Sequence, residues 1–439
     1  SKKLWKRAKK IIPGGNMFLS KRPELFHPEK WPAYFKKSSG INIWDIDGKK
    51  YKDLSLMGVG CNIMGYSNKQ VDNAVIKALK NGNSSTINSY EEVELCERLL
   101  SLHKWADMAK LAKTGGEASA MAVRIARAAT GKDKIAFCGY HGWHDWYLAA
   151  NLNSTKNLNF QLLPGLEPLG VPKGLKNTII PFRFNNWEDF DKIIKKNIKV
   201  SAAIIIEPCR EGFPDKKYLL ELKKIAKKSN AVLIFDEITS GWRINPGGAH
   251  KLINVDPDLV VYGKTIANGI PMSALVGKKD IMSYALKTFI SSVFWTEKTG
   301  PASALAFIKK YKKLNVHKKL IQVGKTVKKI WKEAAKKNDL EIETYGIDSL
   351  AGFKIKSKNW PAVLTYFIQE MLEFNILSTD KCYANFRHDK KALSLYKKAC
   401  EHVFKKISFY EKKGNLIKQL RGPIKEMGFN RLTDPYNDK

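Results

Sequence analysis

Amphipathic stretches alternate with short apolar runs through the middle of the chain. Apolar residues recur at helical spacing over 68–80, 89–103, 116–130 and 216–228. Between these stretches lie apolar runs at 134–138, 202–206, 231–235 and 259–262. Near-continuous apolar runs between helices are typical of buried, mostly parallel strands. We therefore predict an α/β region over roughly 60–315, built on a mostly parallel central sheet.

The two flanks of this region have other patterns. Residues 1–12 form a basic amphipathic pattern that stops at Pro13, and a proline-rich irregular stretch covers 13–40. Alternation around Asp47-Gly48 predicts a hairpin. A lysine-rich helical pattern follows over 303–338, with mixed segments to about 410. We expect an N-terminal segment (1–60), a large domain (61–315) and a smaller α+β domain (316–439) that the N-terminal segment helps to complete.

Composition narrows the class of protein. The 439 residues are 44% hydrophobic, as in an ordinary globular protein, and contain no apolar run long enough to span a bilayer. The first residues do not resemble a secretory signal peptide. The six cysteines are scattered and contain no Cys-x-x-Cys pair, which argues against a zinc site or a disulfide framework. A cytoplasmic, metal-free protein is expected.

The formal net charge of +35 raises the possibility of a nucleic-acid or anionic-membrane partner. The excess is nearly all lysine and is spread along the whole chain. Nucleic-acid sites draw more on arginine, whose planar guanidinium binds phosphate and bases in fixed geometry. We expect a solvated lysine-rich surface, with no nucleic-acid or membrane partner.

Chemistry-bearing residues stand at the ends of three predicted strands. Glu207 follows the run 202–206, Asp236-Glu237 follows 231–235, and Lys264 comes two residues after 259–262. In open α/β sheets, ligands bind beyond the carboxyl ends of the strands. The acids at these strand ends and the lysine would share one edge if these strands are neighbours.

Thr114-Gly115-Gly116 opens the predicted helix at 116–130. Glycines let a ligand approach the main chain closely, and the free N–H groups at a helix start attract phosphate. Taken alone, the motif is more often a simple turn.

Several motifs, in this order, resemble class III aminotransferases, and within them the glutamate-1-semialdehyde aminomutase-like branch. They are Trp44-Asp-Ile-Asp-Gly, Thr114-Gly-Gly-Glu-Ala, Arg124-Ile-Ala-Arg-Ala, Gly139-Tyr-His-Gly, Phe235-Asp-Glu, Thr239-Ser-Gly-Trp-Arg, Gly263-Lys264, Phe294-Trp-Thr-Glu and Gly422-Pro-Ile-Lys-Glu-Met-Gly-Phe-Asn-Arg-Leu-Thr. The resemblance covers nearly the whole chain. It implies a fold-type I transferase fold and pyridoxal 5'-phosphate as cofactor.

The resemblance also implies roles for residues around the cofactor ring. Lys264 would form the Schiff base, and Asp236 would pair with the pyridine nitrogen so that the ring can accept electrons. Tyr140 would stack on one face of the ring and Ile238 would press on the other. Glu207 and Glu237 would lie near the ring hydroxyl, although both could equally be structural acids.

The cofactor phosphate would receive backbone N–H groups from Gly115 and Gly116. Family members of this branch often have Ser-Gly-Thr at 114–116, so a side-chain hydroxyl is missing at Gly116, with Thr114 a potential substitute. Thr296 resembles a residue that reaches the phosphate from the neighbouring subunit. This implies a homodimer with shared active sites.

Substrate-binding residues are less defined by the resemblance. A carboxylate substrate calls for an arginine fork. The candidates are Arg22, Arg210 and Arg387; a fourth arginine, Arg243, has a more structural pattern. Aromatic residues near the presumed pocket, including Trp31 and His141, suit either a larger, sugar-like acceptor or a small amino acid.

Transamination between an amino donor and a carbonyl acceptor, through pyridoxamine phosphate, is the main interpretation of these residues. Intramolecular transfer by an aminomutase is the nearest alternative. Two hypotheses from other classes remain: a nucleic-acid-binding protein, suggested by charge alone, and a catalytically silent relative, suggested by the departure at Gly116.

Overall fold

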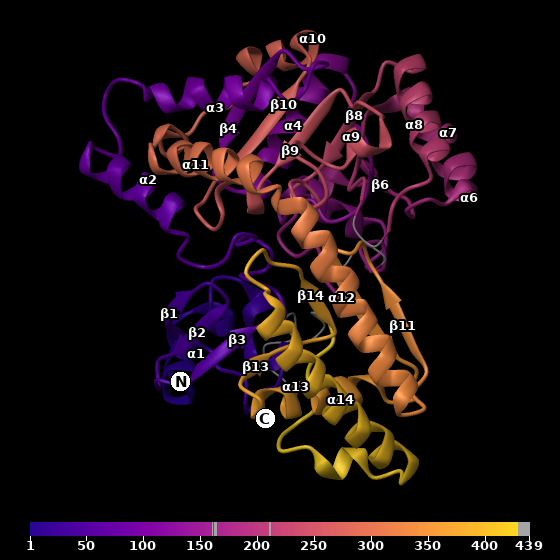
Figure 1. Ribbon diagram of the computed structural model, residues 1–439. Helices are drawn as coiled ribbons and strands as arrows, with labels where there is room; N and C mark the ends of the chain where they lie inside the picture. The colour runs from indigo at the N-terminus through magenta and orange to yellow at the C-terminus, as the bar shows by residue number, and fades with distance from the viewer. Residues whose placement is uncertain (160, 162–164, 210–211, 429–439) are drawn as a thin grey trace. The chain divides into compact units, whose positions relative to one another are not determined.

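The computed structural model describes residues 1–159, 161, 165–209 and 212–428 (Figure 1). The described chain divides into two compact units. The larger is Lys69–His317, and the smaller joins Ser1–Asn68 to the chain from Lys318 onward. Within the described residues, no helix combines the length and apolar character needed to cross a membrane.

A seven-stranded sheet, in the part of the chain that the structure describes, is the centre of the larger unit, with the order β4-β10-β9-β8-β7-β5-β6. Its strands are β4 (Met108–Ala112), β5 (Lys134–Cys138), β6 (Ile179–Pro181), β7 (Ser201–Ile206), β8 (Val232–Asp236), β9 (Leu259–Tyr262) and β10 (Ser273–Gly277). The pairs from β9 to β6 are parallel, whereas β10 runs antiparallel to both β4 and β9. The prediction of a mostly parallel sheet is therefore correct.

Helices surround this sheet. They are α2 (Lys69–Lys80), α3 (Tyr90–Leu100), α4 (Gly115–Thr130), α5 (Asp145–Leu148), α6 (Trp187–Asp189), α7 (Lys195–Asn197), α8 (Lys216–Lys228), α9 (His250–Ile253), α10 (Lys279–Met282) and α11 (Thr299–Leu314). Helix α4 packs against β7, β9 and β10, while α11 packs against α2 and α3.

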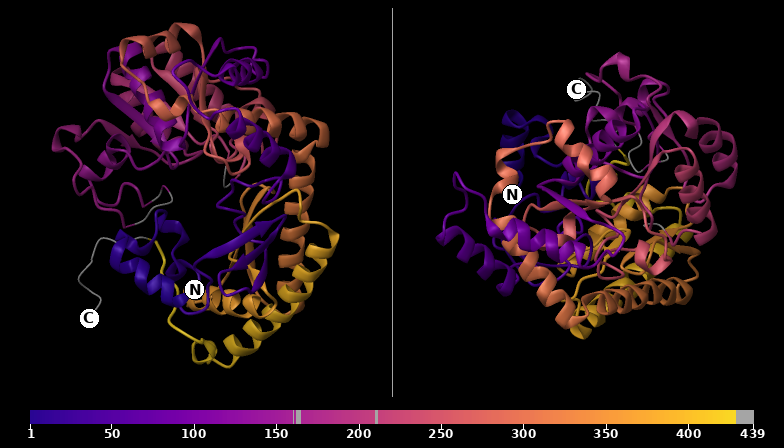
Figure 2. Two further views of the ribbon diagram at one scale, coloured as in Figure 1. Left: turned by 90° about the vertical axis from the view of Figure 1, so that its left-hand side faces the viewer. Right: turned by 90° about the horizontal axis from the view of Figure 1, so that it is seen from above.

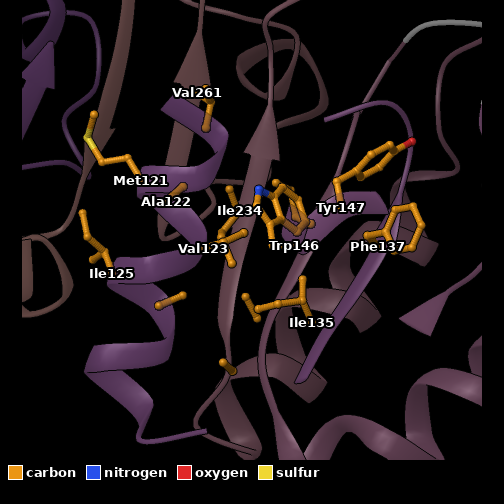
Figure 3. Close-up of a cluster of buried hydrophobic side chains, with 14 of the residues drawn as sticks. Met121, Ala122, Val123, Ile125, Ile135, Phe137, Trp146, Tyr147, Ile234 and Val261 are labelled. Atoms are coloured by element: carbon orange, nitrogen blue, oxygen red, sulfur yellow. The ribbon is translucent and has the colours of Figure 1, made fainter. Parts of the chain in front are cut away.

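The core of the larger unit lies between α4 and the sheet. Met121 and Ile125 on α4 are at most 3% exposed, as are Ile234 on β8 and Val261 on β9. Figure 3 shows these side chains with Trp146 from α5. Burying such side chains contributes about 1.5–3 kcal/mol each, so the helix is held firmly against the strands. The start of α4 is consequently a fixed point of the structure.

The smaller unit combines residues from both ends of the chain. Its strands are β1 (Phe35–Ser39), β2 (Asn42–Asp45), β3 (Lys50–Asp53), β11 (Ile342–Tyr345), β12 (Leu350–Ile355), β13 (Ile376–Leu377) and β14 (Lys381–Tyr383), and its helices are α1 (Lys2–Ile11), α13 (Trp360–Glu373), α14 (Lys390–Lys412) and most of α12 (Val316–Lys337). The pairing of β2 with β3 is the predicted hairpin. Strand β13 adds to β3 in parallel, so C-terminal chain completes the N-terminal sheet (Figure 2, left).

The helical pattern predicted over 303–338 is two helices rather than one. Helix α11 ends at Leu314 because Asn315 takes a left-handed backbone conformation, with φ 47° and ψ 48°, and α12 begins at Val316. Asparagine tolerates this conformation better than most residues, since its short polar side chain can bond locally. The hydrophobic periodicity alone does not reveal the break.

Candidate active site

Strands β7, β8 and β9 are parallel neighbours, so their carboxyl ends lie at one edge of the sheet. Glu207 directly follows β7, Asp236 ends β8, and Lys264 follows β9 after one glycine. The expectation that these three residues share an edge is correct. Their arrangement follows from parallel pairing, which aligns the strand ends.

Asp236 is buried, at 1% exposure, and is held by two donors. Its Oδ2 lies 2.7 Å from Nδ1 of His141, and its Oδ1 accepts a hydrogen bond from the Ile238 amide at 2.9 Å. The other ring nitrogen of His141 lies 3.2 Å from the Cys138 carbonyl oxygen. A buried carboxylate needs such partners, because an unpaired charge in the interior is very costly.

Lys264 begins a short 3₁₀ turn after β9. Its φ is +39°, in the left-handed region that a side chain rarely adopts. Backbone strain of this kind costs about 1–3 kcal/mol and clusters at functional sites. The Nζ atom donates to the Thr239 hydroxyl at 2.7 Å, so the amine is directed toward the turn that follows β8. Thr239 belongs to one of the motifs that resemble the family, Thr239-Ser-Gly-Trp-Arg, but the sequence alone assigned it no role.

The start of α4 forms a cradle of main chain. Thr114 caps the helix: its hydroxyl accepts the Glu117 amide, and the Glu117 carboxylate accepts the Thr114 amide, forming a capping box. A Cβ added at Gly115 would lie 2.7 Å from Cδ1 of Ile238, and one at Gly263 would lie 3.3 Å from its Cγ2. Ile238 therefore packs on glycines from two different segments.

The loop after β5 crosses the same helix start. Gly142 has φ +106°, and a Cβ there would lie 2.8 Å from the Cα of Gly116. A Cβ at Gly116 would in turn lie 3.1 Å from Cε1 of His144. Glycine at 142 permits this approach, and a Cβ at 116 would crowd the imidazole. The first amides of a helix have no acceptor within the helix, and together with the helix dipole they favour an anion.

Tyr140 and Glu207 are joined at the same edge of the sheet. The Tyr140 amide donates to Oε2 of Glu207 at 3.0 Å, and the half-buried Tyr140 ring packs edge-on against Tyr147 at 5.9 Å between centroids. Glu207 also lies against Gly139, where a Cβ would come within 2.8 Å of it. These contacts fix the direction in which Tyr140 leaves the chain.

Glu237 has a structural environment. Its Oε1 accepts the His250 amide at 2.9 Å and lies 3.0 Å from His250 Nδ1, while Oε2 accepts the Ser240 hydroxyl at 2.7 Å. Burial works against ionisation, yet these hydrogen bonds and the neighbouring imidazole lower the pKa of Glu237 overall. Of the two functions considered for this acid, the structure favours the structural one.

Thr296 lies in a short 3₁₀ helix (Val293–Thr296), and its hydroxyl donates to the Val293 carbonyl at 2.7 Å. Apolar side chains in the stretch of chain before it are exposed: Val293 at 74%, Phe294 at 73%, Phe289 at 90% and Leu286 at 88%. Large exposed apolar patches mark interaction surfaces in soluble proteins.

Three of the predicted substrate-binding residues belong to the smaller unit. Arg22 is paired with Glu24 at 3.7 Å and with Glu426 at 3.5 Å. Trp31 stacks on Phe26 with centroids 4.3 Å apart. Arg387 is exposed.

Arg210 lies outside the residues that the structure describes. Arg243 is fully buried, and its Nε donates to the Thr239 carbonyl at 2.6 Å, in keeping with a structural role. Among the described residues there is no cluster of three or more histidine, cysteine or acidic side chains able to hold a metal.

Comparison with known proteins identifies relatives of this chain. A family model described as aminotransferase class III matches residues 27–360. A 3-aminobutyryl-CoA aminotransferase of Cloacimonas acidaminovorans is 36% identical over 70% of this chain and 72% of its own length. A glutamate-1-semialdehyde 2,1-aminomutase of Nitrosopumilus maritimus is also 36% identical, over 71% and 73%.

Solved structures share the fold. The FumI protein of Sphingopyxis sp. MTA144, in its PLP internal aldimine form, superposes with a TM-score of 0.84 at 21% identity, covering 94% of this chain and 97% of that one. A glutamate-1-semialdehyde aminomutase from Pseudomonas aeruginosa PAO1 gives 0.77 at 14% identity, covering 93% and 94%. The predicted fold class, a fold-type I transferase with a smaller α+β part from both chain ends, is confirmed.

Proposed function

The chain belongs to the class III aminotransferases, and we propose that it moves an amino group from an amino donor to a carbonyl acceptor using pyridoxal 5'-phosphate held by Lys264. The observation that carries this proposal is the position of Lys264 and Asp236 at the ends of two adjacent parallel strands, beside a glycine-lined helix start. The expected resemblance to this family is confirmed.

The residues present fit the cofactor in three respects. An amine, Lys264, lies at the sheet edge; a buried carboxylate, Asp236, is held for a cationic partner; and any Cβ at Gly115 or Gly142 would fill the space at the start of α4. When bound, pyridoxal phosphate supplies an aldehyde that takes up an amine and a protonated ring that accepts electron density. The chain's own residues hold and orient it.

Asp236 is proposed to hold the proton at the ring nitrogen of the cofactor. His141 supports it from behind, because the imidazole is sealed from solvent and bonded at both nitrogens. His141 was expected among the substrate-binding residues; these contacts instead support a positioning role through Asp236. A buried carboxylate in a dry site interacts strongly with a cation, so its orientation matters for the reaction.

Lys264 is proposed to carry the reacting amine and to move the proton at the α-carbon of the donor. Thr239 accepts the hydrogen bond from Nζ and so keeps the amine directed. Tyr140 and Ile238 are proposed to cover the two faces of the ring, Glu207 to lie at its hydroxyl side, and Gly115 and Gly116 to bind the phosphate, beside Thr114. Preorganised groups of this kind lower the cost of reaching the transition state.

For the substrate, we propose a molecule with a carboxylate or another anionic group. Arg387 is the arginine best suited to bind it, since it is exposed and no carboxylate of the described residues lies within ion-pair distance of it. Arg22 is already paired with two acids, and Trp31 can add an apolar surface. Arg210 remains a candidate from the sequence alone.

Intramolecular transfer by an aminomutase is the second candidate, because relatives at 36% identity include a glutamate-1-semialdehyde 2,1-aminomutase as well as an aminotransferase. Glutamate-1-semialdehyde supplied alone discriminates between the two. An aminomutase consumes it with no added acceptor, whereas an aminotransferase needs a second substrate.

We further propose a homodimer in the cytoplasm. The exposed apolar residues Leu286, Phe289, Val293 and Phe294 support a subunit interface, from which Thr296 of one protomer would reach the cofactor phosphate of its partner. All six cysteines are free, which suits a reducing compartment. The spread of lysines along the chain supports a solvated surface rather than a nucleic-acid site.

The visible absorption spectrum of the purified protein tests the proposal, beside a Lys264→Ala variant and before and after addition of glutamate or alanine. We expect a yellow protein that an amino donor bleaches, and a variant that lacks the band. A colourless protein after soaking in pyridoxal phosphate would refute the enzyme proposal. A yellow protein that no donor bleaches would indicate a catalytically silent relative.

A further inference from the structure

The phosphate-binding end of the proposed site lacks the side chain that its relatives are expected to use. Residue 116 is glycine, so no hydroxyl is available there. The hydroxyl of Thr114 is occupied in the capping box, where it accepts the Glu117 amide and donates to the Glu117 carboxylate at 3.0 Å. At the start of α4, main-chain amides would then be the only donors that face the phosphate dianion.

His144 occupies the space that a side chain at residue 116 would take. An ideal Cβ at Gly116 would lie 3.1 Å from Cε1 and 3.2 Å from Nδ1 of this imidazole. The ring is kept in place by Trp143, which stacks on it at 4.8 Å between centroids with planes 20° apart. Gly142 brings the loop this close because it carries no side chain.

The Nδ1 atom of His144 is shielded from solvent and has no hydrogen-bond partner among the described residues. A buried polar atom without a partner costs free energy, about 1–3 kcal/mol, and calls for an explanation. Burial lowers the pKa of the imidazole, against the raising effect of Glu117 and Asp145. A neutral imidazole has one N–H, and an anion beside Nδ1 selects the tautomer that places it there.

We propose that His144 is a phosphate-binding residue, whose Nδ1 donates to the cofactor phosphate in place of the hydroxyl missing at Gly116. The inference rests on the proposed function and adds a residue that the family resemblance did not supply. The two positions depend on each other: with glycine at 116 the imidazole fits, whereas a side chain there would crowd it, with the Cβ 3.1 Å from Cε1.

The test measures dissociation constants of the apoprotein for pyridoxal phosphate and for pyridoxal, which lacks the phosphate. Variants are His144→Ala, His144→Asn, which can place an amide N–H near the Nδ1 position, and His144→Gln, which cannot. We expect His144→Ala and His144→Gln to weaken pyridoxal phosphate binding by about 10- to 100-fold, the effect of losing a hydrogen bond to a charged group. Pyridoxal binding should change less than about twofold, and His144→Asn should stay near the parent.

Two further variants distinguish the loss of this hydrogen bond from a general loss of folding. Gly116→Thr in the His144→Ala background has room for its side chain, so it should recover most of the lost affinity, whereas Gly116→Thr alone should bind more weakly than the parent. Equal affinity of His144→Ala and the parent, or an equal loss for both ligands, would overturn the inference while leaving the proposed function intact. No binding of pyridoxal phosphate by the parent would overturn both.

Discussion

Asp236 and His141 form a buried pair at the end of β8, with Oδ2 and Nδ1 2.7 Å apart and both side chains at most 1% exposed. Because the second imidazole nitrogen faces the Cys138 carbonyl, both ring nitrogens point at oxygen acceptors. The carboxylate is fixed on one side before any ligand reaches the other.

His141→Phe tests this pair. Removing one partner leaves a buried charge, and we expect the free energy of unfolding to fall by about 3–5 kcal/mol. Urea unfolding of His141→Phe, Asp236→Asn and the double variant checks the coupling. The double variant should lose clearly less than the sum of the single losses; additive losses would mean that the two side chains do not interact.

Thr239→Val removes the acceptor of the Lys264 amine. Without the 2.7 Å hydrogen bond the amine is less well directed. We expect kcat to fall about tenfold, the rate factor that corresponds to the free energy of one hydrogen bond to a charged group. Thr239→Ser keeps the hydroxyl and should stay near the parent. Steady-state kinetics with a saturating donor measure both; equal rates for Val and Ser would exclude a role for the hydroxyl.

Gly142→Ala should damage the cradle at the start of α4. The φ of +106° strains any side chain, and the new Cβ meets the Gly116 Cα at 2.8 Å. Gly131→Ala is a matched control, because Gly131 also has positive φ, +67°, yet a Cβ there meets no atom within 4 Å. We expect about 1–2 kcal/mol of destabilisation for Gly131→Ala and about 1–3 kcal/mol more for Gly142→Ala. Cofactor retention after gel filtration should fall only for Gly142→Ala.

Acid should destabilise the larger unit through His103. Burial, with a contribution from His250, lowers the pKa of His103 to about 4. The folded imidazole stays neutral, whereas the unfolded one takes up a proton below about pH 6.5. The stabilisation is therefore full above pH 6.5 and is lost as pH falls toward 4, by about 2 kcal/mol between pH 7 and 5.

Urea unfolding of the parent and His103→Gln at pH 7 and pH 5 measures this loss. Glutamine does not titrate, so the variant should lose less stability over that interval. His388 in the smaller unit, whose pKa burial likewise lowers to about 4, provides a second contribution that the variant retains. An identical pH dependence in both proteins would contradict the assignment to His103.

The exposed apolar residues Leu286, Phe289, Val293 and Phe294 predict the oligomeric state. A charge placed in a packed interface is left unpaired, so Phe289→Glu and Phe294→Glu together should convert a dimer into a monomer. Leu220→Glu on α8 is the control, since Leu220 is also exposed, at 44%, but lies on a different element. Light scattering of the three proteins decides; a dimer that survives the double change places the interface elsewhere.

Elements with strong periodicity could be predicted from the sequence, and those that depend on neighbours could not. Helix α8 and strand β9 have the predicted bounds, because each contains a clear apolar pattern of its own. Strand β4 contains lysine and β10 is short and small-residue rich, so their place in the sheet depends on pairing with each other. The break between α11 and α12 at Asn315 depends on the backbone conformation of one residue, which hydrophobic periodicity does not reveal.

The same distinction, between what a local pattern predicts and what distant contacts decide, applies to the residues of the candidate site. The strand-end rule brought Asp236 and Lys264 together, since parallel pairing aligns residues that follow consecutive strands. His141 and Thr239, which position these two groups, were not predicted in that role. Their contacts join residues 95 and 25 positions apart, and no local pattern records such a distance.

The glycine cradle has a further consequence for how the protein can change. Its surface at residues 115, 116 and 142 is main chain, so every substitution there adds atoms and none removes any. Replacement can shrink this end of the site but never widen it for a bulkier group. Variation in a laboratory library, or over generations, is therefore directed to positions outside the cradle, where a side chain can be exchanged for a smaller one as well as for a larger one.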